Sequence, residues 1–312
     1  MRHLLGLHGV PAREIEAILD EANAFLPALR QSPPQTFKTL SGRTIALCFF
    51  ESSTRTRTSF ELAARRLGAG TVNFAAATSS LQKGETLLDT IANLEAMNLD
   101  AFVIRHSDSG AAHLVAKHSK LPVINAGDGA REHPTQALLD MLTLRNALGR
   151  LSGLRVLIVG DILHSRVARS NIFGLRAMGA SVSLCAPPTL LPARIEEFGV
   201  TLYSDLERAI ASCDAAIVLR LQLERETAGF IPSLREYSRF FSLTDDVVAK
   251  QGKKIFVLHP GPMNREVEIS SAVADRRRDG ESPQSLILEQ VTSGVAVRMA
   301  VLRRLLSPER EA

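Results

Sequence analysis

Residues 52–58 combine two serines, three threonines and two arginines, a dense set of hydrogen-bond donors. A nearly continuous apolar, β-branched and aromatic run precedes them at residues 44–50, as expected of a strand that is buried on both faces. Apolar residues at three- and four-residue spacing follow at 59–67, and Gly68 is suited to end that helix. The donors therefore lie where a strand turns into a helix.

A helix start presents backbone N–H groups and the positive end of the helix dipole, so an anion bound there gains backbone as well as arginine hydrogen bonds. Phosphate is the anion that this combination favours. The alternative is a solvated helix cap, in which Thr58 and Glu61 form a capping box. Both can hold together, but two arginines directly after a buried strand favour an anion site.

Arginines also follow other predicted strands. Arg105 comes directly after an apolar strand at 101–104, and Arg220 follows one at 215–219. In open α/β sheets ligands bind beyond the carboxyl ends of the strands, so we expect Arg105 to point toward the same crevice as Arg55.

A further helix is predicted to begin near Pro134, with His133 and Gln136 on one face of its first turn. A histidine at a helix start is disfavoured as a cation, so a neutral imidazole could polarise a carbonyl through a hydrogen bond. A capping or packing role is an equal alternative. Residues 259–262, His-Pro-Gly-Pro, predict a rigid turn at another strand end.

A chain of 312 residues exceeds the size at which one core stops growing, so two domains are expected. We place their boundary near residue 150, before a new strand. The fold class predicted is α/β, with two doubly wound domains that each have a mainly parallel central sheet flanked by helices. The first domain comprises residues 1–150, completed by a C-terminal helix at 284–312, and the second comprises residues 151–283.

Composition excludes several classes of protein. Hydrophobic residues make up 45% of the chain and charged residues 22%, as in soluble globular proteins. No apolar run approaches membrane-spanning length and the N-terminus does not resemble a signal peptide, so we expect a cytoplasmic protein without a membrane partner. The cysteines at 48, 185 and 213 are predicted to be buried free thiols.

The net charge of +4 would permit nucleic-acid binding, but two tyrosines, no tryptophan and no long basic tract argue against it. Anionic small substrates explain the excess of arginine equally well. The turn at residues 160–165 lacks the second and third glycines of the dinucleotide fingerprint, so a nicotinamide cofactor is not expected.

Residues 53–57 resemble the carbamoyl phosphate motif of the transcarbamoylases, and residues 133–136 resemble their second signature. The similarity spans nearly the whole chain, in the same order. Residues 83–85, Arg166, residues 220–222 and residues 259–262 resemble the aspartate branch of the family. The ornithine branch would carry a His-Cys-Leu-Pro turn and an Asp-x-x-x-Ser-Met-Gly segment, and neither occurs here.

This resemblance implies that the amine of L-aspartate attacks carbamoyl phosphate, giving N-carbamoyl-L-aspartate and phosphate for pyrimidine biosynthesis, without a metal or organic cofactor. The catalytic residues that it implies are Arg55, Thr56, Lys83, Arg105 and His133. Those implied to bind carbamoyl phosphate are Ser53, Thr54, Arg55, Thr56, Arg105, His133, Gln136, Gly261 and Pro262. Those implied to bind L-aspartate are Lys83, Arg166, Arg220 and Gln222.

The resemblance also implies a homotrimer with shared active sites, in which Lys83 and one of Ser79 and Ser80 enter the neighbouring subunit's site. Such trimers can join a larger assembly with regulatory or dihydroorotase-like chains. Gly261 departs from the leucine of many relatives, which matters little if its backbone carbonyl is what contacts the ligand.

Two other functions remain open. One is a transcarbamoylase that acts on a different amine, although Arg166 and Arg220 argue against a cationic acceptor. The other is a non-catalytic anion-binding protein that has kept the fold.

Overall fold

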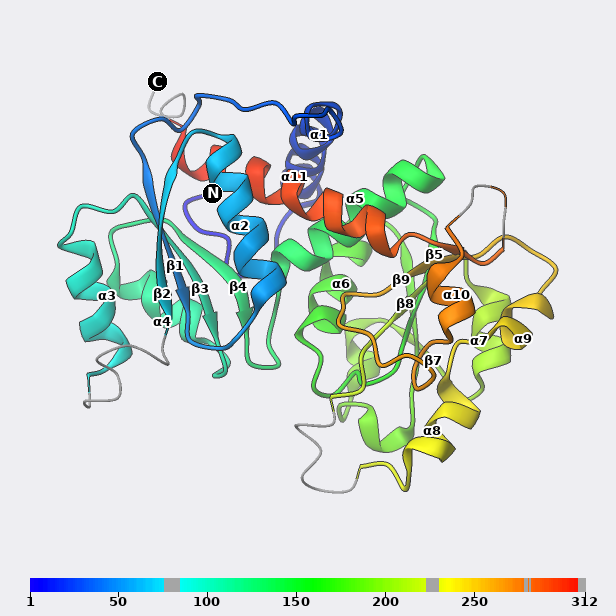
Figure 1. Cartoon of the computed structure of the whole chain (residues 1–312). Helices are drawn as coiled ribbons and strands as arrows, with labels where there is room; N and C mark the ends of the chain where they lie inside the picture. The colour runs from blue at the N-terminus through cyan, green and yellow to red at the C-terminus, as the bar shows by residue number, and fades with distance from the viewer. Residues whose placement is uncertain (76–84, 223–229, 278–279, 281, 308–312) are drawn as a thin grey trace. The chain divides into compact units, whose positions relative to one another are not determined.

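The computed structural model describes residues 1–75, 85–222, 230–277, 280 and 282–307. The chain divides into two compact units, one of Met1–Leu142 with Thr292–Ala312 and one of Thr143–Val291. Each unit contains one parallel β-sheet with helices around it (Figure 1). The predicted α/β fold class is therefore confirmed.

The sheet of the first unit has four strands in the order β2-β1-β3-β4. β1 (Thr44–Phe49) pairs in parallel with β2 (Gly70–Ala75) and with β3 (Ala101–His106), and β4 (Val123–Asp128) pairs in parallel with β3. β1 therefore has a neighbour on each side and is buried from Ile45 onward. This position explains its continuous apolar sequence.

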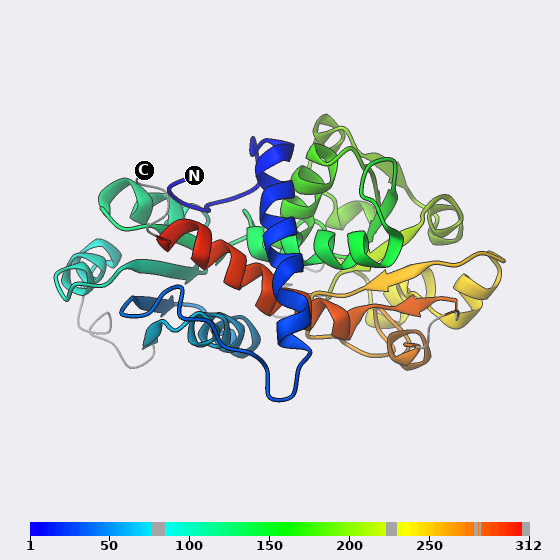
Figure 2. The ribbon, with the colours of Figure 1, turned by 90° about the horizontal axis from the view of Figure 1, so that it is seen from above.

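Helices of the first unit cover this sheet. α2 (Thr54–Arg66), α3 (Leu87–Glu95) and α4 (Ala111–His118) lie between successive strands in the chain, and the side chains of α3 and α4 pack with β1 and β3 in one apolar cluster. α1 (Ala12–Leu29) contacts α11 (Ile287–Leu306), as Figure 2 shows in blue and red.

Two arginines of α11 make the contact with α1. The guanidinium of Arg304 donates a hydrogen bond to the carbonyl of Ala17 at 3.4 Å. The guanidinium of Arg303 lies over the ring of Phe25, 5.9 Å from its centre, and pairs with the carboxylate of Glu21 at 3.3 Å. The last helix of the chain is thereby fixed to the first.

The sheet of the second unit has six strands in the order β10-β9-β8-β5-β6-β7, all paired in parallel. Because a parallel pair needs a crossover, helices or longer segments connect its strands. The strands are β5 (Arg155–Val159), β6 (Ser181–Cys185), β7 (Thr201–Tyr203), β8 (Ala215–Val218), β9 (Phe256–Leu258) and β10 (Gln284–Ser285).

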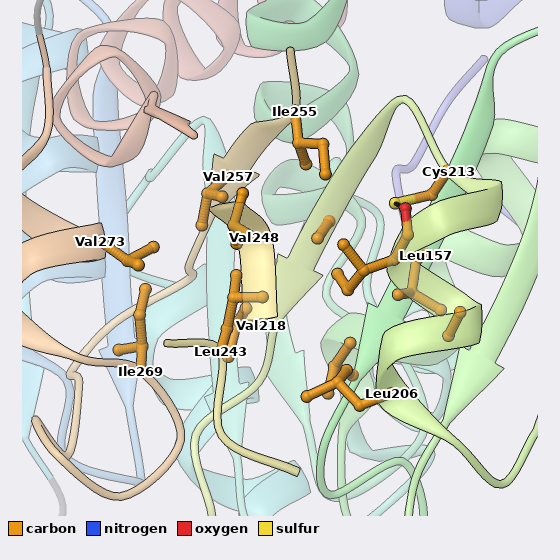
Figure 3. Close-up of a cluster of buried hydrophobic side chains, with 14 of the residues drawn as sticks. Leu157, Leu206, Cys213, Val218, Leu243, Val248, Ile255, Val257, Ile269 and Val273 are labelled. Carbon is orange, nitrogen blue, oxygen red and sulfur yellow. Dashed lines mark hydrogen bonds between the residues drawn. The ribbon is translucent and has the colours of Figure 1, made fainter. Parts of the chain in front are cut away.

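Short helices pack on this sheet around an apolar core. Leu157 and Val218 from the central strands share a buried cluster with Leu206, Val248 and Val273 from three of these helices (Figure 3). The helices are α6 (Arg166–Ala177), α7 (Leu206–Ser212), α8 (Leu234–Phe241), α9 (Asp245–Ala249) and α10 (Ser271–Asp275), with 3-10 turns at Pro188–Leu190 and Ile195–Phe198. Among the described residues, no helix is both long and apolar enough to cross a membrane.

The start of α2 corrects the sequence analysis. The helix begins at Thr54 rather than at residue 59, and the carbonyl of Ser53 accepts the N–H of Arg57 at 3.2 Å. The capping box of Thr58 and Glu61 is therefore wrong, because both residues lie inside the helix. The first turn is polar, so apolar spacing could not indicate it.

The start of the last helix is a second correction. Residues 284–285 were expected to be helical, but they form β10 and pair with β9, and α11 begins only at Ile287. The N–H of Gln284 donates to the carbonyl of Ile255 at 2.8 Å. A strand of two residues is too short to show alternation, so the helical pattern that follows it dominated the prediction.

The three cysteines are free and buried, as predicted. Burial raises the pKa of each thiol to about 12.

Because only the thiolate reacts with a disulfide reagent, the folded protein should not react at about pH 8, whereas the protein unfolded in urea should release three equivalents of product. The absorbance of the released thiol measures this, and rapid reaction of one folded-state thiol would contradict the burial.

Candidate active site

Arg105 joins three strand ends in the first unit. In the register of β3 against β1 it lies opposite Phe49, beside the turn that leads to α2. Its guanidinium donates through Nη1 to the carbonyl of Ala126 at 3.2 Å and through Nη2 to the carboxylate of Glu51 at 3.3 Å. Its side chain is only 12% exposed. Arg105 is thus held beside the polar turn after β1.

The start of α2 presents its donors in that turn. Ser53 has an extended backbone, and its side chain does not cap the helix. Thr56 is buried while Thr54 and Arg55 are exposed, and the first turn contains no acidic residue. A helix start that combines backbone N–H groups, hydroxyls and a guanidinium can bind a phosphate.

His133 and Gln136 lie at the start of α5 (Pro134–Leu148), after the end of β4. The carbonyl of His133 accepts the N–H of Gln136 at 3.0 Å and that of Ala137 at 3.3 Å, so His133 immediately precedes the helix. Both side chains are buried. The predicted residues 53–56, 105, 133 and 136 therefore all lie at or beyond the carboxyl ends of neighbouring strands.

The second unit carries Arg166 in a similar position after β5. Ser165 caps α6 by accepting the N–H of Ala168 at 3.1 Å, and Arg166 is the buried first residue of this helix. The fully buried carboxylate of Asp161 accepts the backbone N–H of His164 at 3.1 Å and lies 2.9 Å from its Nδ1. Asp161 thereby fixes the turn that positions Arg166.

Arg220 and Gln222 follow β8, the strand beside β5. The side-chain amide of Gln222 donates to the carbonyl of His164 at 3.1 Å, which ties this segment to the turn before Arg166. The side-chain amide of Asn264 donates to the carbonyl of Leu221 at 3.1 Å. Three segments of the second unit are thus connected at the carboxyl ends of β5, β8 and β9.

The turn with Gly261 and Pro262 follows β9 and is fixed by a buried pair. The N–H of Gly261 donates to Nδ1 of His259 at 2.9 Å, so the ring proton is on Nε2, which donates to Glu268 at 3.2 Å. Glu268 is fully buried and also accepts the N–H of Asn264. Gly261 has a φ of +63°, a left-handed conformation that favours glycine.

Three predicted residues cannot be placed in this way. Lys83, Ser79 and Ser80 lie outside the described residues. The other predicted site residues belong to two sets, one in each unit.

Sequence reasoning missed several buried polar residues behind these sets: Asp140, Asp161, Glu268 and Arg298. Asp140 could have been found, because it lies four positions after Gln136 and so on the same helix face. Arg298 lies far along the chain from Phe60, and Glu268 contacts His259 across an irregular turn, so no local pattern indicates either residue.

The fold and these two polar sets define an α/β protein with a helix start suited to an anion and a second group of arginines at strand ends. Two family models match the chain: the aspartate/ornithine carbamoyltransferase carbamoyl-P binding domain at residues 2–146 and the Asp/Orn binding domain of the same enzymes at residues 152–305.

The chain is also similar to individual proteins of this family. The aspartate carbamoyltransferase catalytic subunit of Chlorobaculum tepidum is 59% identical over 98% of this chain and all of its own length. The structure of aspartate transcarbamoylase from Trypanosoma cruzi with carbamoyl phosphate and aspartate is 31% identical, with a TM-score of 0.86 over 98% of this chain and 97% of its own. Ornithine carbamoyltransferase from Pyrococcus furiosus is 28% identical, with a TM-score of 0.84 over 98% and 97%. The chain belongs to the aspartate/ornithine carbamoyltransferase family.

The buried His259–Glu268 pair leads to a prediction about stability. The change His259→Ala removes the donor to a fully buried carboxylate, so it should lower the free energy of unfolding by about 2 to 3 kcal/mol. Urea unfolding followed by circular dichroism measures the loss. His118→Ala, at an exposed helix position, is the control and should change stability by less than about 0.5 kcal/mol. Equal losses in both variants would show that the pair does not stabilise the turn.

Proposed function

We infer that this protein is an aspartate carbamoyltransferase, which converts carbamoyl phosphate and L-aspartate to N-carbamoyl-L-aspartate and phosphate, a reaction of pyrimidine biosynthesis. The observation that carries this conclusion is the 59% identity, over nearly the whole chain, to a protein named for aspartate rather than ornithine. The likeness of fold alone does not select the acceptor, because enzymes of both kinds share it.

The first unit supplies the residues for carbamoyl phosphate in this proposal. Ser53, Thr54 and Arg55 at the start of α2 bind the phosphate, together with Arg105, as the exposed helix start and the nearby guanidinium support. Thr56, Arg105 and His133 donate to the carbonyl oxygen. As the amine nitrogen bonds to the carbonyl carbon, negative charge develops on that oxygen, and each well-placed donor contributes roughly 3 kcal/mol.

The second unit supplies the residues for L-aspartate. Arg166 and Arg220 bind its two carboxylates, because a guanidinium donates two parallel hydrogen bonds to such a group. Gln222 adds a further contact, and its anchoring to the carbonyl of His164 supports a fixed position. A positively charged amine acceptor would be repelled by the same arginines.

Gly261 and Pro262 complete the proposed set. Their backbone carbonyls and the side chain of Gln136 accept hydrogen bonds from the carbamoyl NH2 group. The buried pair of His259 and Glu268 would hold the turn rigid for this purpose. When the tetrahedral intermediate collapses, the carbon–oxygen bond to phosphate breaks, and phosphate leaves with the electron pair and takes up the proton that the amine nitrogen loses. Positioning and electrostatic stabilisation are then the main sources of rate acceleration.

We further propose a homotrimer in which Lys83 acts in the neighbouring subunit's site. Its support is the resemblance of the segment at residues 83–85 to the aspartate enzymes. An equal mixture of Lys83→Ala and Arg55→Ala chains, unfolded and reassembled together, should regain part of the activity if sites are shared, because some sites then lack both defects. Activity no higher than the sum of the two pure variants would argue against sharing.

The acceptor is tested directly with the purified chain. Product should form from carbamoyl phosphate with L-aspartate and not with L-ornithine, because the arginines of the second unit match a dianion. A colorimetric assay for ureido products measures both reactions. Product from ornithine, or from neither amine, would overturn the proposed function.

The role of Arg105 gives a second test. Arg105→Met should lower kcat by about 10²- to 10³-fold, because one stabilising donor is lost where charge develops. Arg43→Met is the matched control, since Arg43 precedes β1 and pairs with Asp100 on an exposed surface. Steady-state rates of both variants, with folding checked by circular dichroism, decide whether the loss is specific to Arg105.

A further inference from the structure

The Gln136 side chain is held in one orientation by a buried carboxylate. Its Nε2 donates to Oδ1 of Asp140 at 3.0 Å, one helical turn later on α5. Asp140 is fully buried and Gln136 is 8% exposed. An ionised carboxylate only accepts hydrogen bonds, so the amide must turn its NH2 group toward Asp140. Its carbonyl oxygen, Oε1, is then the end that can accept a hydrogen bond from a ligand.

A buried guanidinium lies behind this pair. Arg298 of α11 is 4% exposed, and its Cζ lies 5.1 Å from the centre of the Phe60 ring of α2. Within the described part of the chain, its Nε has no hydrogen-bond partner. A Cβ at Gly294 would lie 2.7 Å from Nη1 of Arg298 and 3.1 Å from the side chain of Leu139, the neighbour of Asp140. The missing side chain at Gly294 thus makes room for the guanidinium beside α5.

Charge balance explains why an arginine can remain there. Burial, and then the nearby guanidinium of Arg105, lower the pKa of Arg298 to about 10, while the carboxylate of Asp140 opposes this shift. Arg298 is therefore still a cation near neutral pH. Its positive charge and the carboxylate of Asp140 attract each other.

We propose that Asp140 is a positioning residue that fixes the Gln136 amide so that its oxygen selects a hydrogen-bond donor on the acyl phosphate substrate, with Arg298 as the buried counter-charge. This proposal rests on the proposed function and adds the basis of its selectivity for the donor substrate. The group received by Oε1 of Gln136 is the NH2 of carbamoyl phosphate.

Acetyl phosphate is the substrate that tests this selectivity. It has the same phosphate and carbonyl, but a methyl group replaces the NH2. A methyl group cannot donate to Oε1, and a buried polar atom left unpaired is costly. Sites that hydrogen-bond a substrate group discriminate strongly against the analogue that lacks it. If Asp140 sets the amide orientation, this discrimination depends on Asp140.

The experiment compares kcat/KM for carbamoyl phosphate and acetyl phosphate, with L-aspartate as the acceptor, in the wild type and in Asp140→Asn. Asparagine has nearly the same shape but can also donate, so it no longer fixes the amide. We expect the preference for carbamoyl phosphate to fall by about tenfold or more, mainly through the rate with carbamoyl phosphate. A ratio of two rates does not depend on how much of the enzyme is folded, so partial misfolding does not obscure the result.

Asp128→Asn is the matched control, because Asp128 is the other fully buried aspartate of the first unit and accepts hydrogen bonds from Asn125 and from the backbone of Gly110. It should keep the substrate preference even if it lowers stability. An unchanged ratio of the two kcat/KM values in Asp140→Asn, whether or not both values fall, would overturn the proposal while leaving the proposed function intact. No product from the wild type with carbamoyl phosphate would overturn both.

The counter-charge is tested with two arginines of the same helix. Arg298→Met should lower the same preference by several-fold, because the buried positive charge that attracts the Asp140 carboxylate is lost. Arg303→Met is its control, since Arg303 also lies over a phenylalanine ring and pairs with a carboxylate at the surface. In the double variant Arg298→Met/Asp140→Asn, we expect no further loss of preference beyond Asp140→Asn alone. Additive losses would show that Arg298 acts independently of Asp140.

Discussion

The parallel pairing of β1 between β2 and β3 is the constraint on which the first unit depends. Pairing on both sides and burial of its side chains fix the register of β1. That register places Phe49 opposite Arg105, so the turn after β1 and the end of β3 meet at one edge of the sheet. A shift of one residue would move each side chain of β1 to the opposite face of the sheet, and the donors of α2 would then no longer lie beside Arg105.

Three buried carboxylates close to these strand ends each have a side-chain partner. Asp161 binds the turn before Arg166, Glu268 binds His259, and Asp140 binds Gln136. A buried carboxylate without such partners would cost several kcal/mol, so each pair fixes the position of the loop or side chain that it holds. Carboxylates that do not contact substrate therefore fix the positions of residues that are proposed to contact it. Rigid support of this kind is what oxyanion stabilisation requires.

The two units use the same architecture for different ligands. In each, cationic side chains follow neighbouring parallel strands, where helix starts and strand ends leave backbone groups for ligands. The first unit adds hydroxyls and backbone N–H groups at a helix start, which suit a phosphate, whereas the second adds arginines that suit carboxylates. The family relation covers both halves of the chain, which agrees with one enzyme that handles two anions.

The sequence by itself determined the fold class, the main strands and the motif residues, because continuous apolar runs and dense clusters of donors are local patterns. It did not reveal that α2 begins at Thr54, since a polar first turn has no apolar spacing, nor that residues 284–285 form a strand. Only the tertiary structure showed the contacts of Glu268 with His259 and of Arg298 with Phe60. The first contact spans an irregular turn and the second joins two distant parts of the chain, so neither follows a helix or strand period, and burial in the folded state decides which partners these residues need.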